Sequence, residues 1–202
     1  LSSFIQAGKI RYNWGKGYAF NPVGFVNPVK DPTNPDLANA GLLSANIETI
    51  KTFSSKILRT AALTLIAIPA AEEINNNFAE PDQTELAAKL YLMLGTLDLD
   101  VMGQYRDNKL ARWGVDFAYN LREDLEFHGE LAYVNEVLKS TIAGNQLLTT
   151  PEEGYEYLLG IRWLNQWNMT VIAEYYHNDA GQTQEEFQDY LGFLRQSLDS
   201  GN

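Results

Sequence analysis

The sequence predicts an all-β fold, an antiparallel up-and-down β-barrel in which about nine strands are recognisable. Three observations predict it: apolar and polar residues alternate along successive segments, long and short connections alternate, and aromatic residues gather near segment ends. The clearest alternation runs from Leu97 to Asn135, where one set of alternate residues carries no charge and the other carries nearly all of them. A period of two places these sets on opposite faces of a strand, so each strand has an apolar and a polar face.

The expected strands follow the chain at residues 4–12, 47–53, 56–69, 86–94, 97–106, 110–119, 125–135, 155–164 and 169–177. Gly95-Thr96 makes a two-residue hairpin turn. A three-residue turn at 107–109 keeps the polar face in phase and places Gly103 opposite Trp113. Residues 120–124 form the next turn.

We expect one domain over residues 1–202, with a long loop at 13–46 and a polar loop at 136–153. Apolar residues at helical spacing predict a short amphipathic helix over 184–198, inside a loop at 182–202. Bacterial single-chain barrels have even numbers of strands, so an odd count predicts part of a larger barrel. The start at Leu1, without an initiator Met or a signal segment, agrees with processing or truncation.

Composition excludes several classes of protein. A net charge of −11 argues against a nucleic-acid partner. Cysteine is absent, so neither disulfides nor cysteine-bound zinc is available. The longest apolar run, Ala61 to Ala71, is far shorter than the roughly 20 residues that a membrane-spanning helix needs.

The connections predict that the apolar face meets lipid. Long connections follow alternate strands, at 13–46, 70–84, 136–153 and 178–202, and the intervening turns are short, with one tight exception at 107–109. Tyr and Trp residues fall in two bands, one near each set of strand ends. Both features are typical of an outer-membrane barrel. The alternative is a soluble sandwich or small ligand-binding barrel, in which the apolar face is the core.

A turn-rich segment near the start carries a family resemblance. Residues 8–28 read GKIRYNWGKGYAFNPVGFVNP, with Trp14, Gly15, Gly17, Asn21, Pro22, Asn27 and Pro28 as the loop motif. This segment resembles the strand-to-loop transitions of bacterial outer-membrane porin-like barrels, and Glu174 to Gly181 looks like another such transition. The resemblance implies a bacterial outer-membrane location, passage of solutes, and lipid, small solutes and other outer-membrane subunits as partners.

The polar face would then line a lumen. The candidate lining residues are Lys9, Arg11, Arg59, Lys89, Asp98, Asp100, Arg106, Arg112, Asp116, Glu126, His128, Glu130, Arg162 and Glu174. The expected register places Tyr91, Asp100, Asp116 and His128 in one row, as part of an acidic wall. Lys9, Arg11, Arg59 and Lys89 would form a basic region. Opposed walls would select small polar solutes. The alternative is that these charges only pair with one another inside the barrel.

Catalytic, metal and cofactor sites are not expected. His128 and Asp116 lack a nucleophile with predictable geometry, and no fixed-spacing loop supports calcium binding. Gly15 and Gly17 lack the lysine and helix of a phosphate loop. The sequence therefore predicts a porin-like channel for passive diffusion of small polar solutes. Two alternatives stay open: a structural or assembly barrel with a filled lumen, and a channel narrowed by the 13–46 loop or plugged by the helix.

Overall fold

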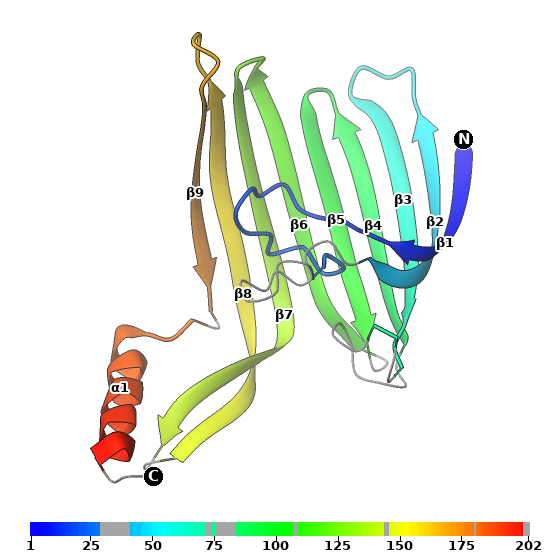
Figure 1. The fold of residues 1–202 in the computed structure, drawn as a ribbon. Helices are drawn as coiled ribbons and strands as arrows, with labels where there is room; N and C mark the ends of the chain where they lie inside the picture. The colour runs from blue at the N-terminus through cyan, green and yellow to red at the C-terminus, as the bar shows by residue number, and fades with distance from the viewer. Residues whose placement is uncertain are drawn as a thin grey trace.

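The computed structural model describes residues 1–28, 41–71, 74–75, 84–106, 109–143, 146–179 and 181–199. These residues form one antiparallel nine-stranded sheet and one helix (Figure 1). The strands are β1 (Ser2–Ile10), β2 (Leu42–Thr52), β3 (Leu58–Pro69), β4 (Thr84–Leu94), β5 (Leu97–Arg106), β6 (Lys109–Arg122), β7 (Leu125–Ala143), β8 (Gln146–Leu164) and β9 (Thr170–Asn178). Each strand pairs with its neighbours in the chain, which confirms the all-β, up-and-down prediction.

The sheet ends at β1 and β9. No pairing between the described residues of these two strands closes the sheet. Closure into a barrel therefore stays a prediction.

The register near Gly103 is confirmed, although the turn that produces it differs from the expectation. Leu94 pairs with Leu97 around Gly95-Thr96, and Gly103 lies opposite Trp113. Arg106 pairs with Lys109, so the expected three-residue turn at 107–109 is wrong. A β-bulge at Ala111 supplies the extra residue instead and restores the phase of the polar face.

A second bulge changes which residues share a row. Arg122 pairs with Leu125, so the turn after β6 is shorter than the expected 120–124, and Leu121 is the extra residue. Asp116 consequently lies opposite Glu130 rather than in the row of His128. The acidic row across the sheet is Tyr91, Asp100, Asp116 and Glu130.

The expected loop at 136–153 is also wrong, because most of it continues β7 and β8 as a long hairpin. Ser140 and Thr149 share a hydrogen bond of 2.9 Å across this extension. Figure 1 shows the extension bending away from the rest of the sheet, beside the helix. Gly144-Asn145 lie outside the described residues.

Among the described residues, a segment covers the polar face of the sheet and none covers its apolar face. Residues 11–28 follow β1 in the chain and are here called the inner segment. They cross one face of the sheet (Figure 1). The hydrophobic core lies between this segment and the polar face, where Trp14, Val23 and Phe25 pack with Ile66 and Met102. The predicted long loop at 13–46 is therefore an ordered covering segment in its first part. Residues 29–40 lie outside the described residues, and 42–46 belong to β2.

The predicted helix is present as α1 (Gln184–Asp199). Thr183 Oγ1 accepts a hydrogen bond of 3.2 Å from the Glu186 backbone N–H, and the Thr183 N–H donates one of 2.8 Å to Glu186 Oε2. This reciprocal pair is a capping box, which satisfies two backbone donors at the start of the helix. Lys139 on the extended hairpin forms an ion pair of 3.0 Å with Glu186, and β7 is the described strand that α1 contacts.

Candidate functional site

The inner segment is held in a compact shape by its own asparagines. The Trp14 backbone N–H donates to Asn27 Oδ1 at 2.6 Å, and Asn27 Nδ2 donates back to the Trp14 carbonyl at 2.7 Å. Asn21 Nδ2 donates to the Gly17 carbonyl at 2.7 Å. Gly15 has a φ of +100°, which side chains with a Cβ rarely adopt, and a Cβ on Gly17 would lie 2.0 Å from the Phe20 carbonyl oxygen. The predicted loop motif therefore builds the fold of this segment.

Glu130 anchors the segment from β7. Its buried carboxylate accepts the backbone N–H groups of Lys16 and Gly17 at 2.6 Å each on Oε1, and that of Val23 at 3.2 Å on Oε2. Hydrogen bonds from several backbone amides to one buried carboxylate are stronger than neutral ones. One side chain of the sheet thus fixes both the outgoing and the returning part of the segment.

Glu174 on β9 makes a second anchor of the same kind. It accepts the backbone N–H groups of Tyr18 at 2.6 Å and Ala19 at 2.9 Å. Nε2 of the buried His128 lies 3.0 Å from Glu174 Oε1, so the imidazole orients this carboxylate. The ring of His128 occupies space left by Gly160, where a Cβ would lie 2.0 Å from Nε2.

Lys16 carries the charge of the segment into the acidic row. Its Nζ lies 2.9 Å from Asp100 Oδ2 and 3.8 Å from Asp116 Oδ1. Burial lowers the pKa of Lys16, but its hydrogen bond to Asp100 and the charges of Asp100, Asp116 and Asp98 outweigh burial, so the pKa is raised. The sequence places Asp100 and Asp116 opposite each other, and Lys16 is the cation that this pair requires.

The apolar part of the segment fits into gaps left by small residues. A Cβ on Gly114 would lie 2.7 Å from Val23 Cγ1 and 3.3 Å from the Phe25 ring. The neighbouring Ala132, which pairs with Gly114, is fully buried. Larger side chains there would lift the segment from the sheet.

Aromatic contacts extend the attachment toward β9. The ring of Phe20 stacks on that of Tyr176 with a centroid distance of 4.4 Å, and Tyr18 meets His128 edge to face at 5.4 Å. On the other side, Lys89 Nζ lies 5.5 Å from the Trp14 ring centroid.

Further charges on the polar face pair with one another. The carboxylate of the buried Glu85 binds Arg106 and Gln104, and Arg112 has charges of both signs nearby, from Arg106, Glu85 and Glu156. Arg162 forms an ion pair of 3.0 Å with Glu126. The polar face thus carries most of the predicted lining residues: Lys89, Asp98, Asp100, Arg106, Arg112, Asp116, Glu126, His128, Glu130, Arg162 and Glu174.

The other three predicted lining residues lie elsewhere. Lys9 pairs with Leu43 and lies with Ile5 and Ala7 on the apolar face, so its placement on the polar face is wrong. Arg59 is the extra residue of a bulge near the turn that contains Gly95, and its side chain is exposed. Arg11 follows β1 and is exposed. The predicted basic region is therefore reduced to Lys89.

Sequence reasoning missed Lys16, Glu85 and Tyr176. Lys16 lies in a Gly-rich turn, and Glu85 lies at the start of a strand. The alternation of apolar and polar residues therefore does not continue on both sides of either residue, and it could not place them. Tyr176 is phased with Glu174, and this signal was sufficient to place it on the polar face.

The described part of the chain contains no group of three His, Asp or Glu residues arranged to hold a metal ion. Its helix is too short and too polar to span a bilayer. Searches with this chain against family models, curated proteins and solved structures return no match.

Proposed function

We propose that this chain is part of a bacterial outer-membrane, porin-like β-barrel through which small polar solutes diffuse past the inner segment. In such a barrel, β1 and β9 pair with further strands or with each other, because an open sheet edge cannot face hydrocarbon. The membrane lipid contacts the apolar face, and the solutes move on the polar side.

One observation carries the proposal: the bare face of the sheet is apolar and the covered face is charged. Leu63, Leu65, Leu90 and Leu159 are all exposed, whereas Asp100, Asp116 and Glu130 are buried. A water-soluble sheet has the opposite arrangement, with large apolar side chains covered and charges in water. Lipid is the solvent that favours this inverted pattern.

Aromatic residues on the apolar face support the same orientation. Rings at the long-connection end follow one row, with centroid distances of 5.9 Å for Trp113–Tyr133 and 5.1 Å for Tyr133–Tyr155. Trp163 lies eight residues from Tyr155 on the same face of β8, about 26 Å along the strand at 3.3 Å per residue. A tilt of roughly 40° shortens this to about 20 Å, close to the roughly 25 Å apolar band of outer-membrane barrels.

The inner segment favours a second candidate, a structural barrel with a filled lumen. The acidic row that was expected to face solutes binds Lys16 and the backbone of the segment instead. If the protein is a channel, the inner segment narrows the lumen. If it is a structural barrel, the inner segment is part of what fills the lumen completely. Liposome swelling separates the two, since a sealed barrel gives no swelling with any sugar, and a channel gives swelling that decreases with sugar size.

Membrane orientation is tested by two adjacent single-cysteine variants, which the cysteine-free chain makes straightforward. In Leu63→Cys the label lies on the apolar face, and in Thr64→Cys on the polar face of the same strand. With the full-length chain in vesicles, we expect a nitroxide at residue 63 to collide mainly with oxygen and one at residue 64 mainly with a water-soluble nickel complex. Greater nickel access at residue 63 would show that the apolar face is not in lipid.

A further inference from the structure

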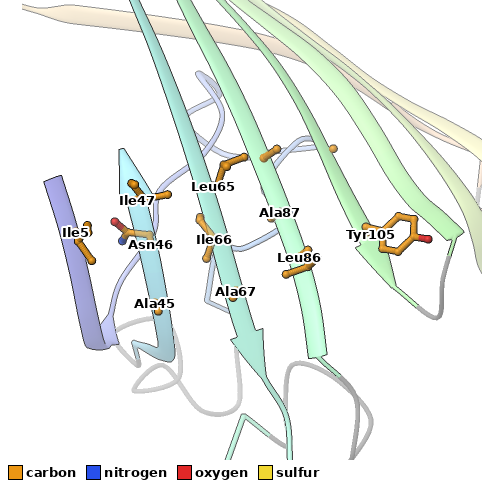
Figure 2. Close-up of a pocket in the computed structure, with 12 residues that line it drawn as sticks. Ile5, Ala45, Asn46, Ile47, Leu65, Ile66, Ala67, Leu86, Ala87 and Tyr105 are labelled. Carbon is orange, nitrogen blue, oxygen red and sulfur yellow. The ribbon is translucent and has the colours of Figure 1, made fainter. Parts of the chain in front are cut away.

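The apolar face has a hollow at the β1–β5 side of the sheet. It has a volume of about 540 Å³ (Figure 2). Its floor is made by Ala45 and Ala67, which pair across β2 and β3, and by Ala88 and Gly103, which pair across β4 and β5.

Large side chains border this floor on two sides. Ile47 and Leu65 lie along one side, and Leu86 and Tyr105 along the other. The floor runs diagonally, because the Ala45–Ala67 pair lies one row nearer the long-connection end than the Ala88–Gly103 pair. The hollow is thus an apolar groove that runs from this end toward the middle of the sheet.

A cation, Lys9, lies near the long-connection end of this groove. Lys9 is exposed on the apolar face and pairs with Leu43, one row beyond the Ala7–Ala45 pair. Tyr105 is level with Ala45, at the end of the sheet where aromatic rings gather. A lysine extended from an apolar surface at this level reaches the phosphate layer of a bilayer.

We propose that this groove binds one acyl chain of a phosphate-bearing membrane lipid, whose phosphate is bound by Lys9. The inference rests on the proposed membrane location and adds a specific lipid site to it. Charge complementarity selects this occupant, because an apolar groove with the exposed Lys9 near one end matches a lipid with an anionic headgroup. A volume of 540 Å³ lies within the roughly 300–1,000 Å³ of small-molecule sites.

The two parts of the site have different tasks. Lipid tails already surround the apolar face, so an acyl chain gains little hydrophobic energy by entering the groove. Its shape instead fixes where one chain lies. The ammonium–phosphate contact then provides the preference for an anionic lipid over a zwitterionic one.

The test measures lipid retained by the full-length protein in mixed phosphatidylglycerol and phosphatidylcholine micelles, by native mass spectrometry. We expect one preferentially retained phosphatidylglycerol, and a preference about fivefold weaker in Lys9→Gln. Lys51→Gln is the matched control, since Lys51 lies on the apolar face at the opposite end of β2 and away from the groove. Inorganic phosphate added in excess should not displace the lipid, because it has no chain for the groove.

A second pair of variants tests the groove itself. The double change Ala67→Leu with Ala88→Leu fills the floor and should abolish the preferential retention. Ala61→Leu on the same face of β3, outside the groove, should leave it unchanged. Two results would overturn the proposal. One is equal lipid retention in wild type, Lys9→Gln and the filled variant. The other is a filled variant that retains lipid as wild type does and differs from it only in oligomeric state. Should the labels at residues 63 and 64 place the sheet in lipid while retention shows no preference, only the lipid site fails.

Discussion

Glu130 concentrates the attachment of the inner segment in one carboxylate. Residues 16, 17 and 23 depend on it for their backbone hydrogen bonds. Glu130→Gln replaces one acceptor oxygen by an N–H₂ group that faces other donors, at a cost of about 1–3 kcal/mol. We expect amide hydrogen exchange at these residues to become about 10- to 100-fold faster, while the strands stay protected.

Glu156→Gln is the matched control for this change. Glu156 lies on the same face of the sheet and accepts a hydrogen bond of 2.9 Å from Tyr176 Oη, without a described contact to the segment. Exchange at residues 16, 17 and 23 should not change in this variant. Equal acceleration in both variants would show that Glu130 has no special role.

In the proposed channel, Lys16 would set the charge that a solute meets beside Asp100 and Asp116. Lys16→Met leaves both buried carboxylates without their cation, so we expect a stronger preference for cations in planar-bilayer reversal potentials. Asp100→Asn with Asp116→Asn should move the reversal potential in the opposite direction. Lys89→Met removes the same charge away from this pair, and an equal shift there would show that only net charge matters.

At the scale of elements, two contacts of α1 depend on one titratable group, the carboxylate of Glu186. The backbone N–H of Thr183 and the ammonium of Lys139 lower the pKa of Glu186. A lowered folded pKa means that the stabilisation is present above the ordinary value of 4.5 and is lost as pH falls through the folded pKa. A nitroxide on Gln188→Cys, near Ile142 of the hairpin, should therefore be immobilised at neutral pH and become mobile in acid.

Glu186→Gln gives the matched comparison for this prediction. It removes the titrating group, so the label should be partly mobile at all pH values and lose its acid transition. A transition that persists in this variant would assign the effect to another group.

Most strands and the helix were predictable from the sequence. The strand register was predictable only beside a two-residue turn. Gly95-Thr96 fixed the β4–β5 pairing, because a two-residue turn allows one alignment. The bulges at Ala111 and Leu121 could not be predicted, since apolar residues extend both alternations without a visible break. The inner segment was harder still, because Glu130 and Gly17 are 113 residues apart and no periodic pattern relates them.

At the scale of the whole molecule, the two candidate obstructions have different positions. The inner segment covers the polar face, whereas α1 contacts the hairpin extension beyond the main body of the sheet (Figure 1). Deleting 184–198 should leave conductance in planar bilayers unchanged. Replacing residues 15–25 by a short Gly-Ser linker should raise it severalfold.

These two variants test the role of each obstruction separately. If the linker variant conducts no better than wild type, the segment does not limit the path. Loss of conductance on deleting 184–198 would assign α1 to the channel and contradict its position beside the hairpin.

The two anchors have a consequence for how this protein could be altered. Glu130 and Glu174 bind backbone N–H groups, which every residue except proline supplies, so these hydrogen bonds do not themselves require particular side chains on the segment. Exchange of the Tyr18 side chain gives up its edge contact with His128 but leaves the backbone hydrogen bond to Glu174 in place. The same two carboxylates would therefore hold a segment that carries different side chains.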